Sequence, residues 1–238
     1  MHLESVVVDA THPRTLGRFW ETALGSQTQA DEPDWFETRL AVPDGPVIDL
    51  CFQRVPEPPT EPRRLHLDLV GGKEQQPVVE RLLALGASPA DIGQGRVPWV
   101  VLADPEGNPF CVMEERAAYV DAGPVAALPL DVADPDRDRD FWMWLTGWVP
   151  VDAGGLLGLR HPSHLGCLLE LCTEVAPKGP AKNRMHLDVR LETSDDADAV
   201  AREIGERGGR ERQFARGDLT WRHFADPSGN EFCVLPPH

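Results

Sequence analysis

The chain has 238 residues and an acidic composition, with 39 Asp and Glu against 23 Lys and Arg and a formal net charge of −16 at pH 7. Because nucleic-acid backbones and anionic membrane surfaces attract positive charge, this balance argues against both as partners. The sequence has no apolar run of membrane-spanning length and no signal-like start, so we expect a soluble, cytoplasmic protein.

In chain order, the first elements predicted are a strand at residues 4–9 and a helix that begins at Pro13 and ends at Gly25. Two strands at 35–42 and 47–53 follow, joined by a Pro-Asp-Gly-Pro turn, with room for a short extra strand before them. The series then begins again after a proline-rich link. It consists of a strand at 65–70, a helix at 75–85 and a hairpin at 97–103 and 108–113.

The second half repeats this series. Strands are predicted at 128–132, 156–160, 165–171 and 185–191, with helices from Asp134-Pro135 to Gly147 and from about residue 195 to Gly208. Each half therefore contains two βαβββ units. Four such units predict an α+β protein in which the helices cover one face of the sheets.

One block of nine residues shows that the two halves are copies. Residues 104–112 read Asp-Pro-Glu-Gly-Asn-Pro-Phe-Cys-Val, and residues 226–234 read Asp-Pro-Ser-Gly-Asn-Glu-Phe-Cys-Val. Phe19-Trp20 likewise matches Phe141-Trp142, at an offset of about 120 residues. Ordered matches at a nearly constant offset indicate a tandem duplication. We expect domains at 1–117 and 125–238, joined by a linker at 118–124.

Strand alternation predicts a polar pair on the sheet face opposite the helices. In the strand at 65–70 the leucines share the helix-packed face, which leaves His66 and Asp68 on the other, and His186 and Asp188 repeat the pair. By the same alternation we expect a small-molecule cup lined by Ser5, Asp49, Cys51, Cys111, Glu170, Cys172 and Cys233, with Trp99 and Trp221 as its walls. In this interpretation Asp49 and Cys51 in the first half occupy places equivalent to Glu170 and Cys172 in the second. Hydrogen-bonded structural residues are the alternative for each.

The chain has five cysteines, an odd number, and none of them form a Cys-x-x-Cys pair. Four of them lie in apolar, strand-like runs, which is typical of buried, reduced thiols rather than of a disulfide framework.

This order of motifs resembles the glyoxalase/bleomycin-resistance/extradiol-dioxygenase superfamily, the vicinal oxygen chelate fold, over nearly the whole chain. Residues 183–189 and the repeated Asp-Pro-x-Gly-Asn-x-Phe-Cys-Val block look like a glyoxalase-like domain. The resemblance implies two tandem glyoxalase-like domains with cup-shaped curved sheets, each sheet built from a pair of units. The chain would then be a monomer that mimics a two-domain dimer, and further homodimer formation stays open.

The resemblance also implies where a divalent cation would be held. In metal-dependent members the ligands come from the first strand, from the strand with the repeated histidine and from the strand after the Asp-Pro turn. These positions fall here on Ser5 and Ala127, on His66 and His186, and on Cys111 and Cys233. One imidazole per cup does not suit Mg²⁺, Mn²⁺ or Fe²⁺, so we expect no metal of the superfamily type. Zinc held with a thiolate and with Asp68 or Asp49 is the alternative.

Two classes of function follow. The first is a binding protein that holds a small organic molecule, aromatic or cationic, in a cup without a metal. The second is a metal-independent lyase, isomerase or hydrolase in which His66 with Asp68, or His186 with Asp188, acts as an acid/base pair. It also stays open whether one half binds while the other serves as a structural partner.

Overall fold

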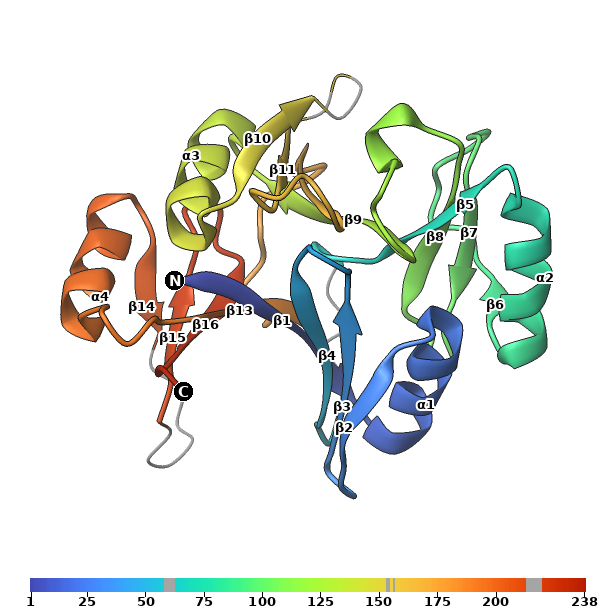
Figure 1. Ribbon diagram of the computed structural model, residues 1–238, viewed down its shortest axis with the longest axis horizontal. Coiled ribbons are helices and arrows are strands. Elements are labelled where there is room, and N and C mark those ends of the chain that lie inside the picture. Colours follow the sequence, from blue (N-terminus) through green and yellow to red (C-terminus); the bar gives the residue numbers. More distant parts are fainter. Residues whose placement is uncertain (58–62, 153–154, 156, 213–219) are drawn as a thin grey trace.

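The computed structural model describes residues 1–57, 63–152, 155, 157–212 and 220–238, which form two eight-stranded curved sheets and four α-helices (Figure 1). Sheet A contains β1 (His2–Ala10), β2 (Gln27–Asp31), β3 (Trp35–Ala41), β4 (Val47–Arg54), β13 (Met185–Arg190), β14 (Arg210–Arg212), β15 (Arg222–Ala225) and β16 (Glu231–Leu235). Sheet B contains β5 (Asp68–Gly72), β6 (Ser88–Pro89), β7 (Val100–Ala103), β8 (Pro109–Glu114), β9 (Val125–Val132), β10 (Val149–Asp152), β11 (Leu157–Arg160) and β12 (Leu168–Thr173). The helices are α1 (Pro13–Leu24), α2 (Gln75–Leu85), α3 (Pro135–Thr146) and α4 (Ala197–Glu206), with a 3₁₀ turn, η1, at Ala117–Tyr119.

The predicted α+β class and the four repeated units are confirmed, and the helices begin and end where the sequence indicates. Proline occupies the first turn of α1 and of α3, where a missing N–H costs nothing. Both helices end at glycines with positive φ, 65° at Gly25 and 70° at Gly147. That left-handed conformation suits glycine because it has no Cβ, which explains why the sequence signal was reliable.

The predicted strand at 65–70 is shorter in the structure, because β5 begins only at Asp68. Before it, Leu65 forms an isolated bridge with Leu130, and the His66 N–H donates to the carbonyl of Pro129 at 3.3 Å. Pro129 has no N–H to return, so the ladder with β9 is interrupted there. In the other half Val7 takes the place opposite His186, and β13 is continuous from Met185.

The sheets are not built from successive units as the resemblance implied. Sheet A runs in the order β14-β15-β16-β13-β1-β4-β3-β2, and sheet B in the order β10-β11-β12-β9-β5-β8-β7-β6. The first unit therefore pairs with the fourth through β1 and β13, and the second pairs with the third through β5 and β9. The repeat divides the sequence into two halves, but each sheet draws on both of them.

The Asp-Pro turns and the Phe-Trp pairs recur together because they are bonded to each other. Trp20 donates its Nε1–H to Asp104 Oδ2 at 3.2 Å, and Trp142 makes the same bond to Asp226 Oδ2 at 3.3 Å. Each aspartate also accepts backbone N–H bonds within its turn. Both tryptophans are buried in the core, as predicted, and edge-on contacts with the phenylalanine after each turn complete the packing.

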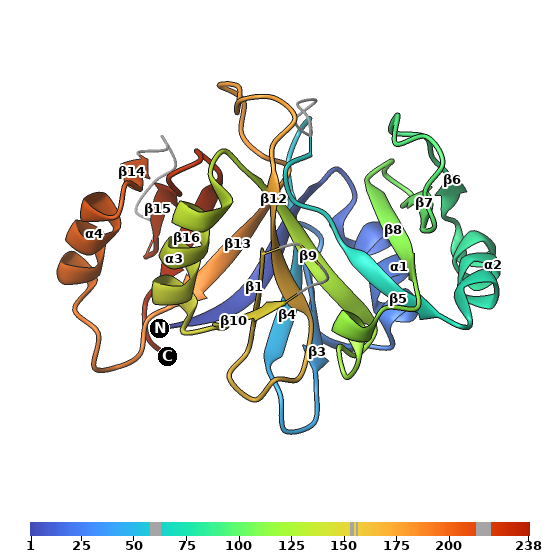
Figure 2. The ribbon, with the colours of Figure 1, turned by 90° about the horizontal axis from the view of Figure 1, so that it is seen from above.

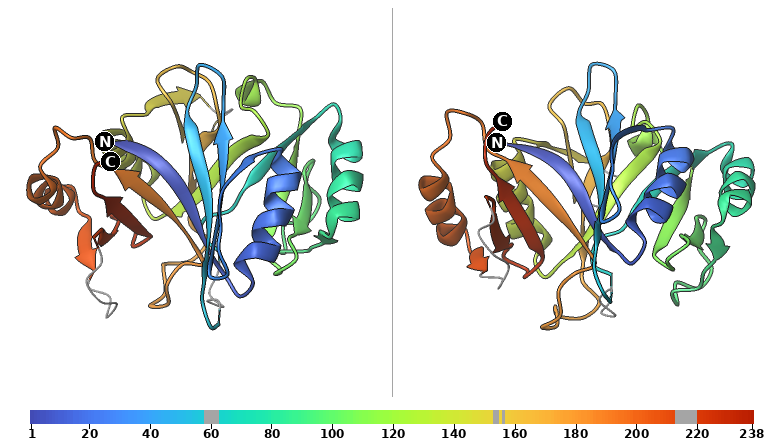
Figure 3. Two further views of the ribbon diagram at one scale, coloured as in Figure 1. Left: turned by 60° about the horizontal axis from the view of Figure 1, so that its bottom comes forward. Right: turned by 90° about the horizontal axis from the view of Figure 1, so that it is seen from below.

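The strands that join the sheet halves cross the middle of the molecule, with α4 and α2 at its opposite ends (Figure 2). The two chain termini lie side by side (Figure 3), since β1 and β16 both flank β13. No helix formed by the described residues combines the length and the apolar character needed to cross a bilayer.

Candidate functional site

The concave face of sheet A encloses a cavity of about 790 Å³, which we call the open cup. Its lining comes from β1, β3, β4, β13, β15 and β16 and is partly apolar and partly charged. Seven of the residues expected to face a cup line it: Ser5, Asp49, Cys51, His186, Asp188, Trp221 and Cys233. The alternation of side chains along β13 thus places the imidazole and carboxylate in the cavity and away from the helices.

Three of these side chains form a cluster at the base of the open cup. Donor atoms of His186, Asp188 and Cys233 lie within 4.8 Å of one another, and His186 Nε2 is 3.3 Å from Asp188 Oδ1. All three residues are buried, and among the described residues neither His186 Nδ1 nor Asp188 Oδ1 has a hydrogen-bond partner, so the 3.3 Å contact is a charge contact rather than a hydrogen bond. Burial, and then the negative charge of Asp188, raises the pKa of the Cys233 thiol, so the sulfur is neutral rather than nucleophilic.

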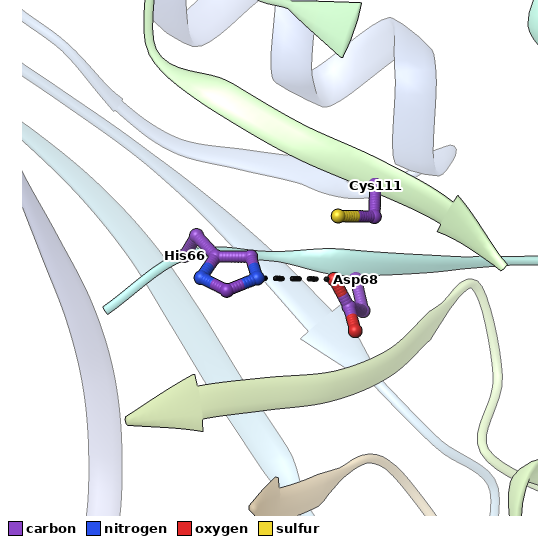
Figure 4. Close-up of side chains that lie close together, drawn as sticks. All are labelled: His66, Asp68 and Cys111. Atoms are coloured by element: carbon purple, nitrogen blue, oxygen red, sulfur yellow. Dashed lines mark ion pairs between the residues drawn. The ribbon is translucent and has the colours of Figure 1, made fainter. Parts of the chain in front are cut away.

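The concave face of sheet B carries a copy of this cluster. His66 Nε2 is 3.3 Å from Asp68 Oδ1, and Cys111 approaches the same carboxylate from β8 (Figure 4). Burial and Asp68 again raise the pKa of the thiol. The clusters differ in exposure, since the His66 side chain is 27% exposed and that of His186 only 6%.

The clusters do not suit the oxygen-preferring cations that metal-dependent members of the superfamily hold. Each offers one imidazole, one carboxylate and one sulfur, and the first-strand position adds only Ser5 in one cup and Ala127 in the other. Mg²⁺ and Mn²⁺ prefer oxygen donors. Zinc accepts such a mixed set, and its binding would require each thiol to release its proton. The metal-free prediction therefore stays a prediction.

Most carboxylates of the open cup are paired with a basic side chain. The pairs are Glu4 with Arg190, Asp9 with Lys182, Asp49 with Arg39, and Glu231 with Lys178. Glu37 differs, because the hydrogen bond it receives comes from the neutral Trp35 Nε1–H at 3.2 Å. Burial, and then the charge of Asp49, raises the pKa of Glu37 despite that bond.

The concave face of sheet B is occupied by the chain itself, so we call it the filled cup. The segment between the halves, residues 115–124, which we call the connector, contains η1 and overlaps the linker expected at 118–124. Within it Tyr119 belongs to one buried cluster with Met113, Leu168 and Ala127, and only 5% of its surface is exposed. The Tyr119 hydroxyl donates to Glu170 Oε1 at 3.1 Å. Burial, and then the charge of Asp68, raises the pKa of Glu170 to about 7.

Arg116 completes the packing of this connector. Its guanidinium lies 5.5 Å from the centres of both the Trp99 and the Tyr119 rings, and its Nε donates to Glu114 at 2.6 Å. The predicted wall residue Trp99 and the predicted ligand-binding residue Glu170 therefore contact the connector in this cup. Cys172 is half-buried on the same strand as Glu170, and burial raises its pKa to about 12.

The ladders correct one predicted equivalence. Ser5 pairs with Asp49, whereas its counterpart Ala127 pairs with Leu168. The strand β12 is therefore shifted by two residues relative to β4, and Glu170 corresponds to Cys51 rather than to Asp49. A shift by two keeps the side chains on the cup face, which is why alternation alone could not detect it.

Sequence reasoning missed the residues that most distinguish the two cups. Trp35 and Glu37 share a face of β3 opposite buried Phe36, so the alternation used for the other strands would have found them. Tyr119 is the only tyrosine of the chain, and its place in an expected linker concealed its role.

Comparison with known proteins supports this architecture. The sequence model of the glyoxalase-like domain matches the chain twice, at residues 5–113 and 127–235, and no curated protein matches it. Glyoxalase I from Zea mays is similar with a TM-score of 0.62 and 14% identity, covering 99% of this chain and 92% of that chain. A putative dioxygenase from Bacillus subtilis is similar with a TM-score of 0.58 and 16% identity, covering 99% and 85%. At such identities the likeness shows the fold alone.

Proposed function

Because this chain belongs to the glyoxalase-like domain family, we propose that it is a binding protein that holds one small organic molecule in the open cup. The observation that carries the proposal is the cavity of about 790 Å³, which falls in the range of about 300–1,000 Å³ typical of ligand sites. Its lining combines Trp35 and Trp221 with apolar side chains and with buried polar groups such as Ser5, His186 and Asp188. Since the connector fills the other cup, the expected stoichiometry is one ligand per chain.

The proposal includes binding without a superfamily-type metal and action in the cytoplasm. Its support is the donor set of the clusters, in which a neutral thiol stands where oxygen-preferring cations need an oxygen donor. The five cysteines are all free, which is in keeping with a reducing compartment. A further homodimer would leave this mode of binding unchanged, because the open cup is formed within one chain.

The test is a ligand screen on chelator-treated protein, followed by tryptophan fluorescence and by calorimetric stoichiometry. We expect a bound compound to saturate at one per chain and to lose affinity in Trp221→Ala. The matched control is Trp99→Ala, because Trp99 occupies the equivalent place in the filled cup. Binding that survives Trp221→Ala and disappears in Trp99→Ala would place the ligand in the wrong cup.

An enzyme is the second candidate, and the contact between His186 and Asp188 favours it. The imidazole lines the cavity, and a carboxylate 3.3 Å from its Nε2 can orient it for proton transfer. A metal-independent lyase, isomerase or hydrolase would use this pair as its acid and base. Chemical change of a bound compound that is lost in His186→Ala and kept in His66→Ala would support this candidate over simple binding.

A further inference from the structure

The filled cup contains an internal occupant that shows what such a cup can hold. The hydroxyl of Tyr119 donates to Glu170 at 3.1 Å, and the guanidinium of Arg116 lies 5.5 Å from the centre of the Tyr119 ring and 5.5 Å from that of Trp99. Arg116 Nη1 also donates to the Tyr119 hydroxyl oxygen at 3.3 Å. An aromatic ring, a hydroxyl donor and a cation thus occupy the cup together.

The repeat allows these contacts to be transferred to the open cup. Ser5 pairs with Asp188 as Ala127 pairs with Asp68, so the two cups share one frame of reference. In that frame Trp221 is the counterpart of Trp99, five residues before the equivalent Asp-Pro turn. Trp221 lines the cavity and is 37% exposed, so one of its surfaces is accessible to a ligand.

The acceptor carboxylate is present in both cups but comes from different strands. In the filled cup Glu170 pairs across the sheet with Gly158, and in the open cup the corresponding pair is Cys51 with Glu37. Cross-strand partners lie side by side on one face, so Glu37 presents its carboxylate next to the place that Glu170 takes in the filled cup. The electrostatic effect of Glu37 on Cys51 agrees with this proximity.

In the open cup Arg39 acts on Glu37 as a nearby positive charge, but burial outweighs it and the pKa of Glu37 stays raised. Arg39, on the same strand as Glu37, is engaged by both oxygens of Asp49 at 2.8 and 2.7 Å. Glu37 accepts a hydrogen bond from the neutral indole N–H of Trp35 at 3.2 Å, and it is half-buried in the cavity wall. A carboxylate partly withdrawn from water gains most from a hydroxyl donor or a positive charge.

We infer that the open cup recognises a phenol carrying a cationic substituent, an inference that rests on the proposed binding function. The hydroxyl donates to Glu37, as Tyr119 donates to Glu170. The cation lies against the face of Trp221, as Arg116 lies against Trp99. The filled cup thus serves as a template for the ligand of the open cup.

The test uses three matched probes: 3-(aminomethyl)phenol, benzylamine, which lacks the hydroxyl, and 3-methylphenol, which lacks the charge. We expect 3-(aminomethyl)phenol to bind at one per chain and each of the other two to bind about tenfold more weakly, because each leaves one recognition group unpaired. Glu37→Leu should abolish the preference for the hydroxyl, and Trp221→Ala the preference for the charge. Trp99→Ala is the control and should leave all three affinities unchanged.

The outcomes separate the inference from the proposed function. If the three probes bind equally, or if Glu37→Leu and Trp221→Ala leave their ranking intact, the ligand class is wrong. If neutral or anionic fragments from a ligand-observed NMR panel bind the open cup while the phenols do not, the proposed ligand class is also wrong, but the proposed binding function is retained. If no fragment of the panel binds at all, the proposed function itself fails.

Discussion

The open cup and the filled cup have the same His-x-Asp and Cys cluster on equivalent strands, yet a cavity of about 790 Å³ lies over the cluster of the open cup, whereas Tyr119 packs over the face of the filled cup. The difference lies in what covers the sheet. In the filled cup the connector places Tyr119 and Arg116 over the face of sheet B, whereas the corresponding face of sheet A lines the cavity. Duplication thus preserved the chemistry of two sites while the connector kept only one of them accessible.

This comparison separates residues that both cups share through the duplicated fold from residues that differ between the cups and therefore bear on ligand binding. A group that is identical in both cups, such as the pair His66 and Asp68 or the pair His186 and Asp188, is explained by the shared fold without reference to a ligand. Groups that differ, such as Glu37 and Tyr119, carry the information about binding. Variants that exchange or remove the differing groups are therefore the sharpest tests.

The largest expected effect comes from Tyr119→Ala. Removing this buried ring empties the filled cup, and truncation of a buried aromatic side chain costs about 3 to 5 kcal/mol of unfolding free energy. Urea denaturation measures the loss. Tyr119→Phe keeps the ring and removes only the hydrogen bond to Glu170, so it should cost about 1 kcal/mol. A loss below about 1 kcal/mol for the alanine variant would show that the connector does not pack in the cup.

The fold was predictable because its signals are local. Pro13 and Gly25 at the ends of a helix, or the alternation around His186, act through the backbone of a few adjacent residues. The identity of the open cup was not predictable in the same way. It depends on the pairing of β1 with β13 across the whole chain, and on the folding of a presumed linker onto β12 through Tyr119. Neither leaves a periodic pattern in the sequence.

The second effect concerns pH and Glu170. Its folded-state pKa of about 7 lies above the unfolded value near 4.3, so the protonated side chain favours the folded state. The stability it confers is complete below about pH 4 and is lost as pH rises through 7. We expect Glu170→Gln to remove on the order of 2 to 3 kcal/mol of this pH dependence, measured by urea denaturation between pH 4.5 and 8.

Two features make this prediction specific to the filled cup. Asp226, with a pKa also raised to about 7 by burial, contributes a slope of the same sign that Glu170→Gln leaves in place. Glu37→Gln in the open cup is the matched control and should change the slope less, because Glu37 remains half-exposed. Parallel stability curves for wild type and Glu170→Gln would contradict the assignment.

A smaller effect distinguishes the two tryptophans. Trp99→Ala removes the ring on which Arg116 stacks and should cost about 1 kcal/mol of stability, whereas Trp221→Ala should cost less because its ring is 37% exposed. Ligand affinity should show the opposite order, with a loss only for Trp221→Ala. Thermal denaturation with and without a bound compound measures both. Equal effects of the two variants on stability and on affinity would mean that the cups are equivalent.

The smallest expected effect is that of divalent metal, which tests the clusters that the two cups share rather than the groups that differ between them. Because both clusters present the same donors, zinc would bind at two per chain, whereas the organic ligand binds at one. We expect no zinc binding, so that Zn²⁺ and chelator each shift the melting temperature by less than about 1 °C. Cobalt titration adds a direct readout, since a cobalt–thiolate bond absorbs strongly in the near ultraviolet. Two bound ions per chain, reduced to one in both Cys111→Ser and Cys233→Ser, would overturn the metal-free proposal and show that the thiols give up their protons to a cation.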